Sequence, residues 1–119
     1  LDAVSPTGAT WNGNNASTWR SAVVKANGFE HEMGYGGQDR EFGERLENLG
    51  LRGTLVRHRA VLLHLDHGRP YRTPESIRKN QKIRATTRSA GVVRARCGIN
   101  ELEPEAEAFV RPAPSGGIE

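Results

Sequence analysis

Residues 34–50 read GYGGQDREFGERLENLG, a glycine-dense loop that runs straight into an amphipathic segment. The adjacent glycines Gly36 and Gly37 leave the backbone free to turn tightly and let a ligand approach closely. Behind them, apolar residues recur at helical spacing, which predicts a helix over residues 39–49 that buries Phe42, Leu46 and Leu49. The segment therefore indicates an open loop placed at the start of a packed helix.

Asp39 stands two residues after Gly37, at the predicted start of this helix. Backbone N–H groups and the helix dipole at such a position favour an ionised carboxylate. An ionised carboxylate beside an open loop can act as a general base that takes a proton from a substrate. The alternative is that Asp39 only caps the helix, and the loop alone does not decide between the two.

Two further helices are predicted, one on each side of this segment. The first follows Ser17 as its N-cap, ends at Gly28, and carries the apolar stripe Trp19, Ala22, Val23 and Ala26. The other runs from Thr73, with Pro74 behind it, to Ala90, and Gly91 is its stop. Between the helices, residues 54–57 and 60–65 are predicted to be short strands, because the apolar run at 60–63 suits a buried sheet position.

The composition describes one small domain. The chain has 119 residues, of which 35% are hydrophobic and 14 are glycines, so it can bury only a modest core. Its single cysteine, Cys97, excludes an internal disulfide framework. No apolar run is long enough to cross a membrane as a helix.

Basic side chains concentrate between residues 68 and 96. Nine Lys and Arg residues lie there against one acid, Glu75, although the net charge of the whole chain is only +3. Such a stretch can bind phosphates, nucleic acid or an anionic membrane surface, and the alternative is a solvated helix face. Its only aromatic residue is Tyr71, which argues against stacking on single-stranded nucleic acid.

His64 lies near the end of the second predicted strand, and His67 lies just beyond it. On a strand, residues three apart point to opposite faces, so the two imidazoles need not serve one ligand set. Two histidines also do not complete a divalent-ion site, which needs further protein or substrate ligands. A pair of ordinary surface or core histidines is the alternative interpretation.

The order of these pieces is more specific than any one of them. Along the chain it runs Gly13, Asn15, Ser17 and Arg20, then Asn27-Gly28-Phe29, Gly34–Asp39, Phe42–Leu46, Gly50-Leu51 and His64-Leu65-x-His67. Over residues 10–98 this order resembles the C-terminal half of a family 2 type glycosyltransferase with the GT-A fold. It is similar to the C-terminal region that galactosyltransferases share with bacterial polysaccharide glycosyltransferases.

The resemblance implies an α/β fold, namely the C-terminal part of a GT-A domain with helices around a short, incomplete mixed sheet. Residues 1–98 would then form the acceptor and catalytic portion, and the acidic residues 99–119, rich in Pro and Gly, are predicted to be a disordered tail. The D-x-D motif of the family does not occur here. We therefore expect this chain to be part of a larger catalytic domain.

The resemblance also assigns roles to individual residues. Asp39 matches the general base of the family, and the metal ligands are His67 and, as an additional ligand, His64. The substrate-binding positions are Tyr35, Gly36, Gly37, Gln38 and Arg69. The implied cofactor is a divalent metal, Mn²⁺ or Mg²⁺, which stabilises a departing nucleotide diphosphate. Gln38 stands where the family usually has an acid, which leaves the sugar preference open.

We therefore expect a metal-assisted, inverting hexosyltransferase of polysaccharide biosynthesis. It would move a sugar from a nucleotide-diphospho-sugar donor to a hydroxyl of a carbohydrate acceptor, with no nucleic-acid partner. The expected location is the cytoplasm, and peripheral association with the inner face of the membrane is left open. Two alternatives remain, a non-enzymatic basic binding module and an inactive glycosyltransferase remnant. The donor sugar, the acceptor, the linkage and the oligomeric state stay undetermined.

Overall fold

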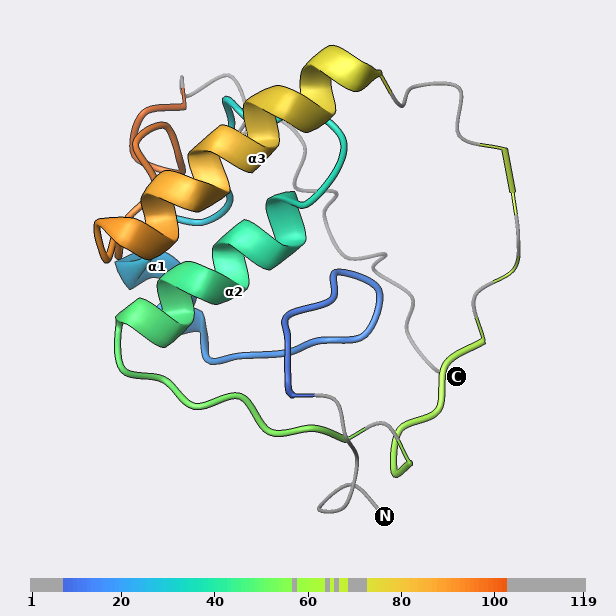
Figure 1. Cartoon of the computed structure of the whole chain (residues 1–119). Helices are drawn as coiled ribbons and strands as arrows, with labels where there is room; N and C mark the ends of the chain where they lie inside the picture. The colour runs from blue at the N-terminus through green and yellow to red at the C-terminus, as the bar shows by residue number, and fades with distance from the viewer. Residues whose placement is uncertain (1–7, 57, 64, 66, 69–72, 103–119) are drawn as a thin grey trace, which may run out of the picture.

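The computed structural model describes residues 8–56, 58–63, 65, 67–68 and 73–102, and within them the chain forms three helices (Figure 1). Helix α1 spans Arg20–Lys25, α2 spans Gln38–Asn48 and α3 spans Pro74–Ser89. Helices α2 and α3 lie side by side and run in the same direction (Figure 1). Their N-terminal ends therefore lie at the same end of the pair.

The apolar core is built around the ring of Phe42 on α2, which is only 1% exposed. The ring of Trp11 meets it edge-on with centroids 4.9 Å apart, and the ring of Phe29 stacks on it at 4.7 Å. Ala22, Ala26 and Leu46 complete the buried cluster, and Leu49 packs against it half-buried. The predicted buried face of the second helix is thus confirmed.

The ends of α2 and α3 also confirm the prediction. Thr73 caps α3, because its Oγ1 accepts the N–H of Ser76 at 3.2 Å. Gly50 (φ 86°) follows α2 and Gly91 (φ 61°) follows α3, each in the left-handed conformation that closes a helix. Both boundaries follow from local chemistry, so local sequence is sufficient to predict them.

The start of α1 differs from the prediction. The cap residue is Trp19, which makes no side-chain hydrogen bond, so Ser17 is not the N-cap. Trp19 is also 80% exposed rather than part of the apolar stripe. At the other end, Asn27 (φ 62°) takes the first left-handed position, one residue before the predicted Gly28. An Asn side chain tolerates this conformation.

A buried polar cluster joins the three helices. The Arg45 guanidinium is fully buried and binds both carboxylate oxygens of Glu41, with N–O distances of 2.9–3.0 Å. It also donates to the carbonyl of Ala26 at the end of α1. The hydroxyl of Thr87 on α3 donates to the same Glu41 carboxylate at 2.9 Å. One ion pair on α2 therefore contacts both neighbouring helices.

The segment after α3 is attached to the turn after α1 by polar contacts. The Asn27 side chain donates to the carbonyl of Ala95 and to the Glu101 carboxylate, and the Glu30 carboxylate accepts the backbone N–H of Arg96. The N–H of Gly98 and the Asn27 amide lower the pKa of the Glu101 carboxyl by hydrogen bonding to its charged form. The domain boundary after residue 98 stays a prediction, and residues 103–119 lie outside the described part of the chain.

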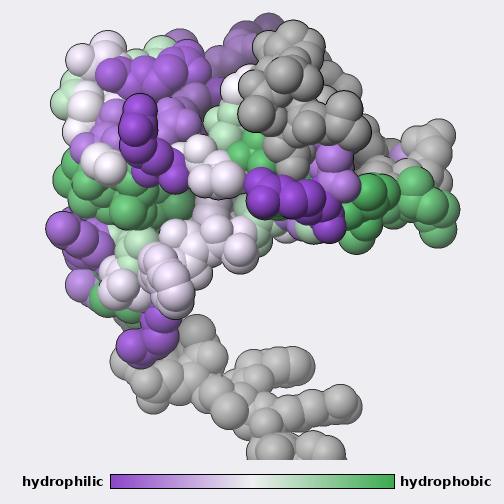
Figure 2. All heavy atoms as spheres, turned by 90° about the horizontal axis from the view of Figure 1, so that it is seen from below, coloured by the Kyte–Doolittle hydropathy of each residue, from purple (hydrophilic) through white to green (hydrophobic). Residues whose placement is uncertain are grey.

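The predicted α/β fold is wrong for the described residues, which contain no strand and hence no sheet. The positions proposed as strands, where described, are irregular, and their apolar side chains are exposed: Val61 is 76%, Leu63 is 84% and Leu65 is 83% exposed. Figure 2 shows this run as apolar surface at one edge of the molecule. A strand needs a neighbour for its backbone hydrogen bonds, and no described segment supplies one.

None of the helices in the described ranges is long and apolar enough to cross a lipid bilayer.

We predict that replacing Arg45 by Met lowers the free energy of unfolding by about 3–5 kcal/mol, because Glu41 is left as an unpaired buried charge. The matched control is Arg78→Met, which breaks an ion pair with Glu75 whose two side chains are 70% and 75% exposed. Urea unfolding should show a loss of less than about 1 kcal/mol for the control. Equal losses in the two variants would show that the Arg45 pair does not hold the helices together.

Candidate functional site

The loop before α2 turns sharply at two consecutive glycines. Gly36 has φ 109° and Gly37 has φ 87°, both in the region that side-chain-bearing residues rarely adopt. The side chain of Gln38 folds back over the loop, where its Oε1 accepts the N–H of Gly36 at 2.9 Å. Gly37 is also the residue that precedes α2, so the loop geometry sets the direction in which the helix begins.

Asp39 lies in the first turn of α2, half-buried, with both carboxylate oxygens in contact with backbone N–H groups. Its Oδ2 accepts the N–H of Gly13 at 3.2 Å, and its Oδ1 accepts the N–H of Arg40 at 2.8 Å. Each carboxylate oxygen can accept more than one hydrogen bond, so the group keeps capacity for a substrate hydroxyl. Asp39 is not the cap residue of the helix, since Gly37 holds that position.

Helix α3 holds the outer side of the glycine loop. The side-chain amino group of Asn80 donates to the carbonyls of Gly34, Tyr35 and Gly36 at 2.9, 3.2 and 2.8 Å. The hydroxyl of Ser76 donates to the carbonyl of Tyr35 at 2.9 Å. Side chains of α3 therefore contact the backbone of the loop that contains the predicted substrate-binding positions Tyr35 to Gln38. These side chains lie more than thirty-five residues further along the chain.

Arg84 closes the same side of the loop. A Cβ atom at Gly37 would lie 3.3 Å from Cδ and 3.6 Å from Nη1 of Arg84. The guanidinium is fixed by Glu44 on α2, with Nη2 2.6 Å from Oε1, and Arg88 binds that same oxygen at 2.9 Å. The basic stretch thus supplies an arginine next to the loop, at a position that had no role in the sequence prediction.

Sequence reasoning did not identify Ser76, Asn80 or Arg84, although a signal for them exists. Ser76, Asn80, Arg84 and Thr87 recur at helical spacing, so they share one face of α3. A polar face on a helix is ordinarily read as solvated, yet Asn80 is 1% and Thr87 is 3% exposed. Burial of such a face depends on what packs against it, and that information lies elsewhere in the chain.

One of the predicted metal ligands, His67, lies away from the packed helices (Figure 1). His67 is exposed, with Nδ1 3.0 Å from the carbonyl of Gly68, and Figure 1 shows this segment running well outside the packed helices. His64 and Arg69 lie outside the described residues. Within the described ranges, no three His, Cys, Asp or Glu side chains gather as a ligand set. The divalent-ion site that the resemblance implies therefore stays a prediction.

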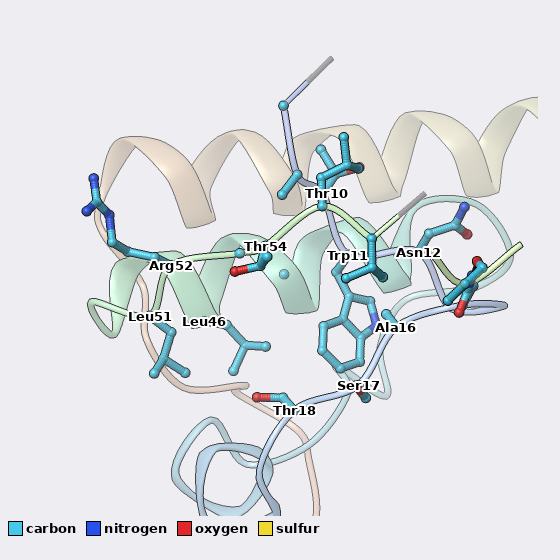
Figure 3. A pocket seen from close by; sticks show the side chains of 18 of the residues that line it. Thr10, Trp11, Asn12, Ala16, Ser17, Thr18, Leu46, Leu51, Arg52 and Thr54 are labelled. Carbon is cyan, nitrogen blue, oxygen red and sulfur yellow. Dashed lines mark hydrogen bonds between the residues drawn. The ribbon is translucent and has the colours of Figure 1, made fainter. Parts of the chain in front are cut away.

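A separate hollow of about 960 Å³ is bordered by the residues on either side of Gly13 (Figure 3). It is lined by residues 8–12 and 14–19, by one face of α2, and by residues 51–56 and 60–62. Figure 3 shows Trp11, Leu46 and Thr54 among its walls. The loop at residues 34–39 does not line it. The hollow therefore forms a feature distinct from the Asp39 site.

We predict that Gly37→Ala and Gly50→Ala each destabilise the protein by about 1–2 kcal/mol, because both residues have a left-handed backbone. Their φ angles are nearly equal, 87° and 86°, but a Cβ at Gly50 meets nothing within 4 Å. Only Gly37→Ala should therefore shift the NMR signal of the Arg84 Nε–H. An unchanged Arg84 signal in Gly37→Ala would contradict the close packing of this arginine on the loop.

Comparison with known proteins identified no protein similar to this chain. No protein-family model matches this chain, no curated protein matches it, and no solved structure matches it. The likeness to glycosyltransferases therefore depends on the order of the motifs in this sequence, and the roles that it assigns to Tyr35, Asp39 and His67 stay predictions.

Proposed function

We propose that this protein takes part in glycosyl transfer, with Asp39 as the general base that activates a sugar hydroxyl. The placement of Asp39 is the observation that carries the proposal. Its carboxylate stands in the first turn of α2, two residues after Gly37, and backbone N–H groups orient both of its oxygens. A half-exposed, oriented carboxylate close to two consecutive glycines is suited to accept a proton from a bound hydroxyl.

The motif order gives the second line of support. This chain resembles family 2 type glycosyltransferases in the order of four motifs, which are Asn27-Gly28-Phe29, Gly34–Asp39, Phe42–Leu46 and His64-Leu65-x-His67. The GT-A fold is not an argument for the proposal, because the described residues form no sheet. The proposal rests on the loop, on Asp39 and on the order of motifs.

The proposed reaction is a single displacement. The acceptor hydroxyl gives its proton to Asp39, and its oxygen attacks the anomeric carbon of a nucleotide-diphospho-sugar. The bond from that carbon to the diphosphate oxygen breaks on the opposite face, so the sugar is transferred with inversion and the nucleotide diphosphate leaves with the bonding electrons. If a divalent cation takes part, His67 and His64 would hold it, and it would neutralise charge on the departing diphosphate.

The competing function, a basic binding module, is less well supported. Arg78, Lys79, Lys82 and Arg88 are exposed on α3. Arg78 is paired with Glu75, however, and Arg88 and Arg84 both bind Glu44. Part of the positive charge is therefore neutralised within the chain, which weakens an interaction with polyanions.

We predict that Asp39→Asn lowers the rate of sugar transfer about 10²–10⁴-fold, because the amide cannot accept the proton. The assay measures UDP release from UDP-glucose, UDP-galactose and UDP-N-acetylglucosamine, with a mixture of methyl glycosides as acceptors. Glu47→Gln, an exposed acid on the same helix, should leave the rate within about 2-fold of the wild type. Transfer that survives in Asp39→Asn would exclude this residue as the base, and no transfer by the wild type from any donor would count against the proposed function.

We also propose that His67, with His64, contributes to binding Mn²⁺ or Mg²⁺. Mn²⁺ alone, added to the protein, should broaden the imidazole proton signals of His67 and His64 at lower concentration than those of His31 and His58, because paramagnetic broadening falls steeply with distance. In His67→Ala, the selective broadening at His64 should disappear. Uniform broadening of all four histidines would remove His67 from the metal site.

A further inference from the structure

We infer that Asn80 is the positioning residue of the proposed transfer reaction: from α3 it holds the glycine loop in the conformation that aims the Asp39 carboxylate. The inference rests on the proposed function, since it names the side chain that prepares the proposed base. It also assigns to α3 the role of positioning the loop before α2. Neither the positive charge of this helix nor its few apolar residues indicate that role.

The contacts of Asn80 are concentrated on one short piece of backbone. Its amino nitrogen lies 2.9, 3.2 and 2.8 Å from the carbonyl oxygens of Gly34, Tyr35 and Gly36, which are three successive residues. Carbonyl dipoles that converge in this way repel one another unless a donor stands between them. The two N–H groups of one Asn80 side chain therefore serve three consecutive carbonyls of the loop, and the Ser76 hydroxyl adds a donor to the middle one.

Asn80 is a poor choice for a residue that serves stability alone. The side chain is 1% exposed, and its Oδ1 has no hydrogen-bond partner in the described part of the chain. A buried acceptor without a partner opposes folding, and Asn in a helix interior is less favourable than Ala or Leu. The side-chain amide N–H groups of Asn80 contact the loop carbonyls, and these contacts offset both unfavourable effects.

The loop conformation is transmitted directly to Asp39. The N–H of Gly36, whose carbonyl Asn80 holds, donates to Gln38 Oε1 at 2.9 Å. Gly37 is the N-cap of α2, and Asp39 is the second residue of that helix. A change in the peptide planes of the loop would therefore turn the first residues of α2 and redirect the carboxylate. Further along α2, Glu41 is held independently by Thr87 at 2.9 Å.

Thr87 supplies a matched control for the test. It lies on the same face of α3, is 3% exposed, and makes a buried hydrogen bond to α2, but none of its hydrogen bonds reaches the loop. Asn80→Ala and Thr87→Val each remove buried hydrogen bonds between α3 and the rest of the chain. Only Asn80→Ala removes the donor for the loop carbonyls, so the two variants separate loop positioning from loss of stability.

The first readout is the NMR order parameter of the Gly36 and Gly37 amides, which needs no substrate. In Asn80→Ala we expect the order parameters of these two amides to fall from a rigid value of about 0.85 to below about 0.6. In Thr87→Val we expect them to stay at the wild-type value. Unchanged order in Asn80→Ala would overturn the inference. This arm decides whether Asn80 holds the loop even if the protein transfers no sugar.

The second readout is the kinetics of transfer, with the same UDP-sugars and methyl glycosides, at a temperature at which both variants are folded. Asn80→Ala should lower kcat about 10–100-fold with little change in KM, because a misplaced base slows the chemical step. Thr87→Val should keep both constants within about 2-fold of the wild type. An equal loss of kcat in the two variants would show that Asn80 acts only through stability.

Ser76→Ala keeps the inference testable if Asn80→Ala does not fold. It removes one hydroxyl donor to the Tyr35 carbonyl and leaves the Asn80 contacts in place. We expect a smaller drop in the order of Gly36 and a fall in kcat of about 3-fold or more. Ser76→Ala with wild-type order and wild-type kcat would contradict the view that α3 positions the loop.

Discussion

The buried guanidinium of Arg45 is the constraint on which the rest of this small structure depends. A charge without access to water is tolerated only when its partners are in place, and those partners come from separate parts of the chain. Glu41 lies one turn away on α2, the carbonyl of Ala26 ends α1, and Thr87 on α3 reaches the Glu41 carboxylate. The three helices can therefore meet in few ways that leave no buried charge unpaired.

This arrangement also explains how the candidate site arises. The Glu41–Thr87 and Glu44–Arg84 contacts hold α2 and α3 parallel, which brings the loop before α2 against the first turns of α3. Asn80 and Arg84 then lie against one side of the loop. The carboxylate of Asp39, in the first turn of α2, stays half-exposed. The charged residues of α3 thus include structural partners of α2, in addition to a solvated face.

Local patterns predicted the helices over residues 39–49 and 73–90 well, because their caps, glycine stops and apolar spacing lie within a few residues of one another. The same reasoning failed for residues 54–65. An apolar run shows that a segment prefers burial, but a strand exists only where a second backbone accepts its hydrogen bonds. The prediction that Trp19 belongs to the apolar stripe was wrong for a similar reason, since helical spacing identifies a face of the helix but not the segment that covers it.

Sequence alone was sufficient to identify the glycine turn, the carboxylate behind it and the ends of α2 and α3, because each is a property of neighbouring residues and their backbone preferences. It could not identify Asn80 as the residue that contacts the loop, nor Thr87 as the partner of Glu41, because these pairs are separated by more than forty residues. Such contacts exist only after α2 and α3 have packed in parallel, and the register of that packing depends on which buried polar groups satisfy one another across the whole chain.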